Sequence, residues 1–528
     1  MRGFCLLGLG LVLLAGCGGR NSPAQPEVWV HWHYGGSAPL QASAQATQTK
    51  RLLAMPETRA LAEQTLDKLA RAPRRWGMDP EVAAAHLRPL VAQLTQAEHV
   101  FQWRQSPAPG SEWALAVHLD AHSQGIWKTN LQALFQRWTG QPPSADPETG
   151  GLRWNLPSQQ GGGVLVLAQS RDWLILGGGP AALRLPSEWA SAIQAQQRPV
   201  PAANAYWARL RVDWPALRHR LPPWLRELDL PSTDLLVNSW NDQLQLRAEL
   251  RFPRPHGWAP EPWLFPSNLI REPLVGFCAV RGIRPRLQPW LERAGLKLSP
   301  VPNQFCAWSL GTAPFQVFAA VPVPEPTNAM RELCRVLPPW FNTNSQGRAL
   351  GWWIVPTNRP AIVWEGMPFF GAFCRPAHEE TAHGFLFAGL FPNTARKEAP
   401  PPELFAQILG RTNLVYYDWE MGSERVNSWR IISQVALLLA ERQQLAAHTP
   451  GARWLDMLST NLGNIGTSVV ATGPDRMVFT RTAPLGLTGL ETVLLVHWLE
   501  APGFPWALQW PPEPKPQRPA SRRPSTGS

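Results

Sequence analysis

Pairs of strand-like segments joined by short polar turns run through this sequence, and they constrain the fold more than any other feature. Two examples are "GVLVLAQSRDWLILGGG" and "TDLLVNSWNDQLQLRAELRFP", in which SRD and NDQ separate two apolar runs. Short polar turns between such runs are typical of antiparallel hairpins. Helical segments follow the hairpins, so we expect helices to cover one face of antiparallel sheets.

The strands and helices also follow one another in a loosely repeating order. Four stretches read strand, helix, strand, strand and often helix, and they begin with "WALAVHLDA", "YWARLRVD", "GFCAVRGI" and "NLVYYDWEM". We therefore predict an α+β protein of repeated antiparallel sheet-and-helix (β-α-β-β-α) units, packed as two to four sub-domains. Because alternating patterns are common, the alternative is an irregular succession of hairpins and helices. The predicted segments are 1–16 (signal peptide), 17–27 (lipidated N-terminus and spacer), 28–100 (N-terminal strand and helical region), 101–200 (first unit), 201–268 (second unit), 269–345 (third unit), 346–412 (extra strands and helix), 413–509 (fourth unit) and 510–528 (disordered basic proline-rich tail).

Several helix ends carry recognisable signals. Asp79 followed by Pro80 predicts a helix start, because aspartate caps the first free N–H groups and proline suits the first helical position. Thr488 and Glu491 have the spacing of a capping box. Ser423 is the expected N-cap of the helix that follows "NLVYYDWEM".

The N-terminal "MRGFCLLGLGLVLLAGC" is a targeting segment. Its apolar run is shorter than the roughly 20 residues that span a bilayer, and it fits the core of a secretory signal. Leu14-Ala15-Gly16-Cys17 resembles the lipobox of bacterial lipoproteins. The resemblance implies cleavage before Cys17, acylation of that residue and partnership with a membrane through the lipid. A plain signal peptide with a chance cysteine is the alternative.

Charge and composition narrow the class of partner. The net charge is +11, which in a cytosolic protein would suggest nucleic acid. For an exported lipoprotein we expect no nucleic acid, and anionic lipid or an acidic envelope polymer is a better counterpart. A basic surface without a particular partner is the simpler alternative.

Gly18 is not the aspartate that retains some lipoproteins in the inner membrane, which favours the outer membrane. No later segment is apolar for 18 residues, so we predict no transmembrane helix.

Four cysteines follow Cys17, namely Cys278, Cys306, Cys334 and Cys374. In an exported protein they allow three disulfide pairings, and buried thiols are an equal alternative. None forms a C-x-x-C motif, so zinc and thioredoxin-like chemistry have no support.

Other motifs that suggest metal or nucleotide chemistry fail on spacing. "HEETAH" (His378 to His383) places its second histidine one residue too far for a zincin site. His31 and His33 share a strand face without a third ligand nearby, which favours a solvated strand edge. The glycine-rich stretches match neither G-x-G-x-x-G nor the P-loop. We expect no metal and no cofactor.

The 28 tryptophans are the compositional hint of a ligand. Trp352 and Trp353 are adjacent, and exposed rings of this kind bind sugars or lipid interfaces. Most other tryptophans occupy alternating or helical positions, which is typical of a core.

Asp418 and Glu420 are the candidate catalytic pair. Their spacing places both carboxylates on one face of a strand, with Tyr417 and Trp419 on the other. Two nearby carboxylates are the working pair of glycosidases. The alternative is a charged strand face that leads into a helix.

From these features we expect a lipid-anchored envelope protein that acts as a non-enzymatic binding or structural scaffold. The alternatives are an envelope hydrolase or polysaccharide-binding protein that uses tryptophans and carboxylates, and a carrier of an apolar ligand.

Overall fold

The computed structural model describes residues 27–73, 78–107, 109–157, 162–199, 206–312, 316–344, 351–366, 371–378, 384–390, 398–400, 402–440 and 442–506. The lipobox with Cys17, residues 379–383 of "HEETAH" and the tail from residue 510 lie outside the described residues.

The described strands all belong to one antiparallel sheet of twenty strands. The first ten are β1 (Val28–Tyr34), β2 (His99–Gln105), β3 (Ser111–His118), β4 (Ser144–Ala145), β5 (Leu152–Asn155), β6 (Val164–Ser170), β7 (Trp173–Gly179), β8 (Ala208–Val212), β9 (Ser232–Trp240) and β10 (Gln243–Arg251). The second ten are β11 (Leu274–Arg281), β12 (Gln304–Leu310), β13 (Val317–Val323), β14 (Trp352–Ile354), β15 (Ile362–Glu365), β16 (Phe373–His378), β17 (Gly384–Gly389), β18 (Leu414–Met421), β19 (Asn464–Ala471) and β20 (Arg476–Ala483).

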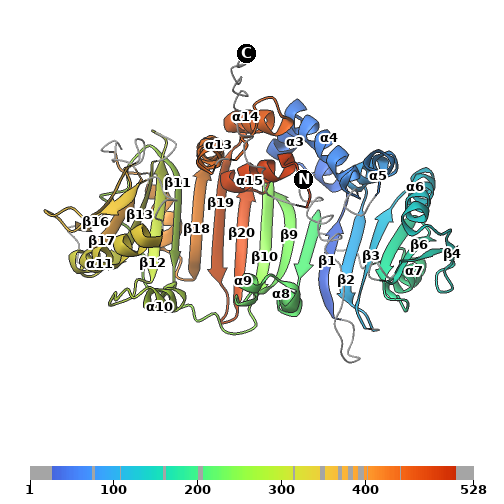
Figure 1. The fold of residues 1–528 in the computed structure, drawn as a ribbon, viewed down its shortest axis with the longest axis horizontal. Coiled ribbons are helices and arrows are strands. Elements are labelled where there is room, and N and C mark those ends of the chain that lie inside the picture. The colour runs from blue at the N-terminus through green and yellow to red at the C-terminus, as the bar shows by residue number, and fades with distance from the viewer. Residues whose placement is uncertain are drawn as a thin grey trace, which may run out of the picture.

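The two sets of ten strands have the same spatial order. The pairings give β4-β5-β6-β7-β3-β2-β1-β8-β9-β10 for the first set and β14-β15-β16-β17-β13-β12-β11-β18-β19-β20 for the second. Strand β10 then pairs with β20 and joins the two halves into one sheet. The central strands stand side by side in Figure 1.

The predicted β-α-β-β-α units packed as two to four sub-domains are therefore wrong. A hairpin pattern specifies that a strand pairs with its sequence neighbour, but it does not specify what lies at the hairpin's other edges. Here those edges pair over long distances, as in β1 with β8 and β11 with β18, so no unit closes on itself.

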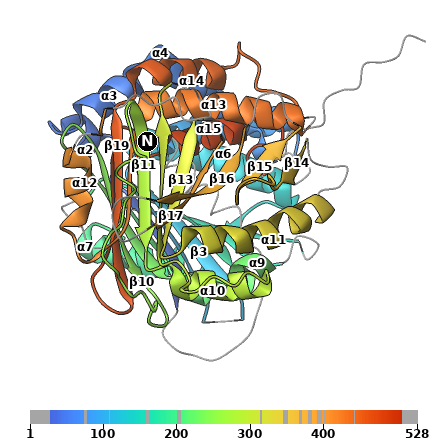
Figure 2. The same cartoon turned by 90° about the vertical axis from the view of Figure 1, so that its left-hand side faces the viewer.

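The helices of the two halves lie mostly between corresponding strands. Those of the first half are α2 (Ala38–Ala42), α3 (Thr47–Ala54), α4 (Pro56–Ala70), α5 (Pro80–Leu94), α6 (Ala121–Thr139), α7 (Leu185–Gln196), α8 (Trp214–Leu217), the short 3₁₀ helix η3 (Arg218–Arg220) and α9 (Pro223–Arg226). Those of the second half are α10 (Arg284–Arg293), α11 (Pro326–Asn344), α12 (Pro402–Leu409), α13 (Gly422–Leu439), α14 (Pro450–Asn461) and α15 (Gly489–Glu500). Helices α7 and α12 each lie before the eighth strand of their half, and Figure 2 shows them on one side of the sheet, with α10 and α11 on the other.

Local sequence signals explain several of these elements. Asn241 and Asp242 have positive φ angles of 48° and 64°, as a tight two-residue hairpin between β9 and β10 requires. The Asp79 carboxylate accepts from the first N–H groups of α5, and Thr488 and Glu491 form the capping box of α15, so both signals are confirmed. Ser423 is not an N-cap, because α13 begins at Gly422 with Met421 in the capping position.

The core is divided between the two faces of the sheet. In the first half both faces are covered: Trp32 and Phe101 pack under α5 and α6, and Ile175 packs under α7. In the second half, Phe277 and Trp308 pack on the side of α12. Among the described residues, no helix is long and apolar enough to cross a membrane.

Candidate functional site

The second half leaves one face of its strands partly uncovered, and we call this the open face. Two rows of side chains cross it in register from β20 to β12. The polar row contains Arg481, Thr467, Asp418, Cys278 and Ala307. The apolar row beside it contains Phe479, Val469, Tyr416, Val280 and Phe305.

On β11 and β12, the exposure of side chains differs sharply between the two sides of the sheet. Every side chain of the apolar row is half-buried or exposed, and Phe305 reaches 36%. On the α12 side, Phe277 and Trp308 are each only 2% exposed. A contiguous apolar row that remains accessible is characteristic of a binding surface rather than of a core.

The internal symmetry of the sheet explains why this face is open. Between β1 and β2 the chain inserts four helices, α2 to α5, and α5 packs with α6 over Trp32 and Phe101. At the matching place between β11 and β12 it inserts α10 alone, which has 10 residues. The second half therefore lacks the cover that the first half has.

Asp418 and Glu420 lie where the sequence places them, on the same face of β18. Asp418 is opposite Cys278 on β11 and Thr467 on β19. Tyr417, on the other face, donates a hydrogen bond to Gln407 of α12 and is buried. Asp418 and Glu420 thus share one face of β18 with Tyr416, while Tyr417 lies on the other.

Glu420 has a structural task. Its Oε1 accepts a hydrogen bond of 2.6 Å from the backbone N–H of Gly489, the first residue of α15. Its Oε2 lies 3.6 Å from Arg425 Nε of α13. Burial raises the pKa of Glu420, and the Gly489 N–H opposes that rise. Glu420 thus fixes α13 and α15 against the end of β18, at the edge of the open face.

Asp418 has no comparable partner among the described residues. Arg481 donates to Thr467 at 3.1 Å and to Glu491 at 2.6 Å, and Arg425 faces Glu420. The charged side chains around Asp418 thus comprise three carboxylates (Asp418, Glu420, Glu491) and the guanidinium groups of Arg425 and Arg481. One carboxylate has no positive charge to balance it, and this is Asp418.

The surroundings of Asp418 favour its protonated form. Burial, followed by repulsion from Glu420, raises the pKa of Asp418 from its ordinary value of 3.8 to about 7. Burial and the nearby Asp418 also raise the pKa of the Cys278 thiol to about 11, so this thiol stays neutral. The Asp418 carboxyl group can therefore bind or release a proton near neutral pH.

This shift predicts a specific dependence of stability on pH. Between about pH 4 and pH 7 the unfolded chain releases the Asp418 proton while the folded protein keeps it, so the free energy of unfolding falls as pH rises. The neutral variant Asp418→Asn should be more stable than the parent at pH 8, by on the order of 2 kcal/mol, and equal to it near pH 4. Urea unfolding at both pH values measures this difference, and parallel pH profiles for the two proteins would contradict the assignment.

The other candidates from the sequence are placed elsewhere. Trp352 is 53% exposed on the edge strand β14, whereas Trp353 packs edge-on against Trp364 at 5.0 Å. They do not form a joint aromatic platform, and neither belongs to the open face. A hollow of about 530 Å³ beside α10 contains none of Asp418, Glu420 and Trp352.

His31 and His33 do not form the predicted solvated strand edge. Strand β1 pairs with both β2 and β8, so it lies inside the sheet. His33 contacts Glu98 at 3.0 Å and Tyr206 at 3.1 Å. Burial, assisted by His33, lowers the pKa of His31 to about 4. Within the described part of the chain, no group of three His, Cys, Asp or Glu residues could hold a metal ion.

Comparison of the chain with known protein families, with curated proteins and with solved structures finds no match.

Proposed function

We propose that this protein is a lipid-anchored binding protein of the cell envelope, and that its open face holds an amphipathic ligand with a protonated amine. The observation that carries the proposal is the juxtaposition of an unmatched carboxylate, Asp418, with a partly exposed apolar row. The ligand's apolar body would cover Phe479, Tyr416 and Phe305, and its amine would face Asp418.

Physical complementarity supports this class of ligand. Covering the apolar row removes hydrocarbon surface from water, which is favourable by about 25 cal/mol per Å². A cation beside Asp418 would balance the cluster's extra carboxylate and return the pKa of Asp418 toward its ordinary range. An anionic headgroup would instead meet Asp418 as a like charge.

Binding is better supported than hydrolysis. A hydrolase of the glycosidase type needs two available carboxylates, and Glu420 is already engaged by Gly489 and Arg425. Asp418 alone remains accessible. A carboxyl group with a pKa of about 7 can also bind a cation reversibly, because it releases its proton near neutral pH.

The envelope location is part of the proposal and rests on Leu14 to Cys17. An acylated Cys17 would tether the protein to a membrane, where amphipathic ligands are available. Metabolic labelling with a radioactive fatty acid tests the anchor. Label should be incorporated by the parent chain and be absent from Cys17→Ala, and equal labelling of the two would contradict the anchor.

Binding of dodecylamine below its micellar concentration tests the ligand class. We expect Asp418→Asn to weaken this binding about 10- to 100-fold, because a charge-assisted hydrogen bond to an ionised group is lost. Glu424→Gln is the matched control, since this exposed carboxylate lies on α13 outside the open face, and it should leave the affinity unchanged. Isothermal titration at pH 8 gives the dissociation constants. Dodecanol binding as tightly as dodecylamine, or Glu424→Gln weakening binding as much as Asp418→Asn, would refute the amine assignment.

A further inference from the structure

The sheet places the four cysteines of the described chain in different surroundings. Cys278 and Cys306 lie on adjacent strands, but Cys278 is opposite Ala307 and Cys306 is opposite Ala279. Their side chains therefore point to opposite faces of the sheet and cannot form a disulfide. The Cys306 thiol is buried and donates toward the Ala320 carbonyl at 3.9 Å.

Cys374 lies under α11 at the far end of the sheet. On β16 it is opposite Ile362 of β15 and Ala388 of β17. Ile362 and Leu386 form the floor on which α11 packs, with Met330 of the helix fully buried against them. The side chain of Cys374 thus points from the sheet toward this helix.

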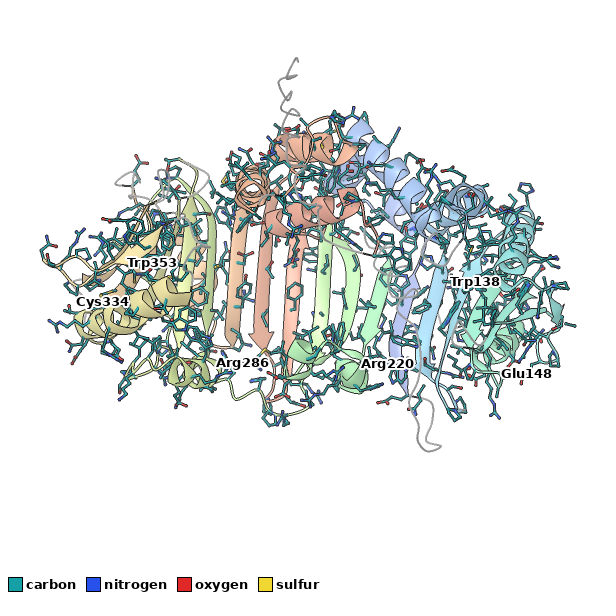
Figure 3. The ribbon with its side chains drawn as sticks, in the orientation of Figure 1. Trp138, Glu148, Arg220, Arg286, Cys334 and Trp353 are labelled. Atoms are coloured by element: carbon teal, nitrogen blue, oxygen red, sulfur yellow. The ribbon has the colours of Figure 1, made fainter. Side chains whose placement is uncertain are left out.

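Cys334 lies on α11, one helical turn after Met330, and so points toward the same floor. Its thiol donates to the carbonyl of Ala361 at 3.5 Å, and Ala361 directly precedes the residue opposite Cys374. Figure 3 labels Cys334 and Trp353 of β14 at the same end of the sheet, and both pack against this cluster.

These contacts place both thiols against the same cluster between α11 and the sheet. Ile362 and Cys374 are opposite each other, with Cα atoms about 5 Å apart, and the Cys334 thiol contacts the carbonyl of the residue before Ile362. Burial and then the neighbouring Cys334 raise the pKa of the Cys374 thiol to about 12. Both cysteines are half-buried, so a small oxidant can reach them.

We infer that Cys334 and Cys374 are a disulfide-forming pair that fastens α11 to β16. This pairing depends on neither the proposed ligand nor the lipid anchor. Of the three complete pairings that four cysteines allow, the one that joins these two would also join Cys278 to Cys306. The sheet prevents that second bond, so Cys278 and Cys306 remain thiols.

The bond would form by exchange with an external disulfide, either a small molecule or a protein. One cysteine thiolate attacks a sulfur of the oxidant and releases the first thiol, giving a mixed disulfide. The second cysteine thiolate then attacks the protein sulfur and releases the second thiol. The two cysteines lose two electrons and two protons in total, and the oxidant gains them.

Raised thiol pKa values predict a slow reaction at neutral pH. Burial raises the pKa of both thiols, so little of either is present as the reactive thiolate. The rate should increase about tenfold per pH unit between pH 7 and pH 9, as the thiolate fraction does. The bridge should also raise the melting temperature by a few degrees, because it constrains the unfolded chain.

Peptide mapping of the full chain tests the pairing. The protein is incubated with oxidised glutathione, blocked with N-ethylmaleimide and digested without reduction. Mass spectrometry should find one peptide pair that joins Cys334 to Cys374, with Cys278 and Cys306 carrying the maleimide. Cys278→Ala should retain the linked pair, whereas Cys374→Ala should lose it and leave Cys334 alkylated.

Two results would overturn the inference. One is recovery of Cys334 and Cys374 as maleimide adducts after oxidation at pH 9. The other is a linked peptide that contains Cys278 or Cys306. Because the mapping on the parent protein needs no substitution, a folding defect in a variant cannot obscure the answer, and circular dichroism checks the fold of each variant.

Discussion

Trp308→Ala is expected to lower the free energy of unfolding by about 3 to 5 kcal/mol, which is typical of removing a large aromatic side chain from a core. Trp308 is 2% exposed and stacks on Phe387, with ring centroids 5.9 Å apart. Phe318 lies 5.8 Å from the same ring. The substitution would therefore leave a cavity at the centre of the core on the α12 side.

Phe305→Ala is the matched control, because Phe305 lies on the same strand and faces the open side. It is 36% exposed, so its loss should cost about 1 kcal/mol or less. Chemical denaturation followed by tryptophan fluorescence and circular dichroism measures both variants. Equal destabilisation by the two substitutions would contradict the division of β12 into a core face and an open face.

Arg281→Ala is also expected to lower the free energy of unfolding by about 3 to 5 kcal/mol, because it deprives one buried and three partly buried carbonyl groups of their donor. Arg281 is 4% exposed. It donates to the carbonyls of Leu414, Glu261, Arg411 and Thr412 at 2.7 to 2.8 Å. Its loss would loosen the chain segment that leads into β18, which carries Asp418.

Arg286→Ala controls for the removal of one positive charge. Arg286 is exposed on α10, and Figure 3 labels it at the lower edge of the molecule. Its substitution should change the free energy of unfolding by less than about 0.5 kcal/mol. An Arg281→Ala variant as stable as Arg286→Ala would show that the carbonyl contacts of Arg281 contribute little.

The local features of the fold could be predicted from the sequence. The turn at Asn241 and Asp242, the cap at Asp79 and the capping box at Thr488 depend on residues close together in the chain. Each involves dihedral preferences or hydrogen bonds within a few residues, and such signals are readable without knowledge of the neighbours.

The single sheet could not be predicted in the same way. The joint between the halves pairs Leu244 with Ala483 and Arg251 with Arg476. Alternation along β10 and β20 identifies two strands with one apolar face, but many strands share that property. The partner is decided by the combined packing of the whole sheet, so the sequence pattern led to separate units instead.

The candidate site shows the same limit. The spacing of Asp418 and Glu420 was sufficient to place them on one face, because side-chain direction alternates along a strand. It could not identify the groups that set their chemistry. Arg481, Cys278 and the N–H of Gly489 come from distant segments, and only the register of β18 with β11 and β19 brings them together.

The central claim is that the open face binds an amphipathic amine at Asp418. A crystal structure of the protein with dodecylamine tests it most directly. We predict the amine nitrogen within hydrogen-bond distance of the Asp418 carboxylate, about 2.7 to 3.2 Å, and the alkyl chain over Tyr416 and Phe479. A structure in which the amine occupies another surface, while the open face holds no ligand, would contradict the claim.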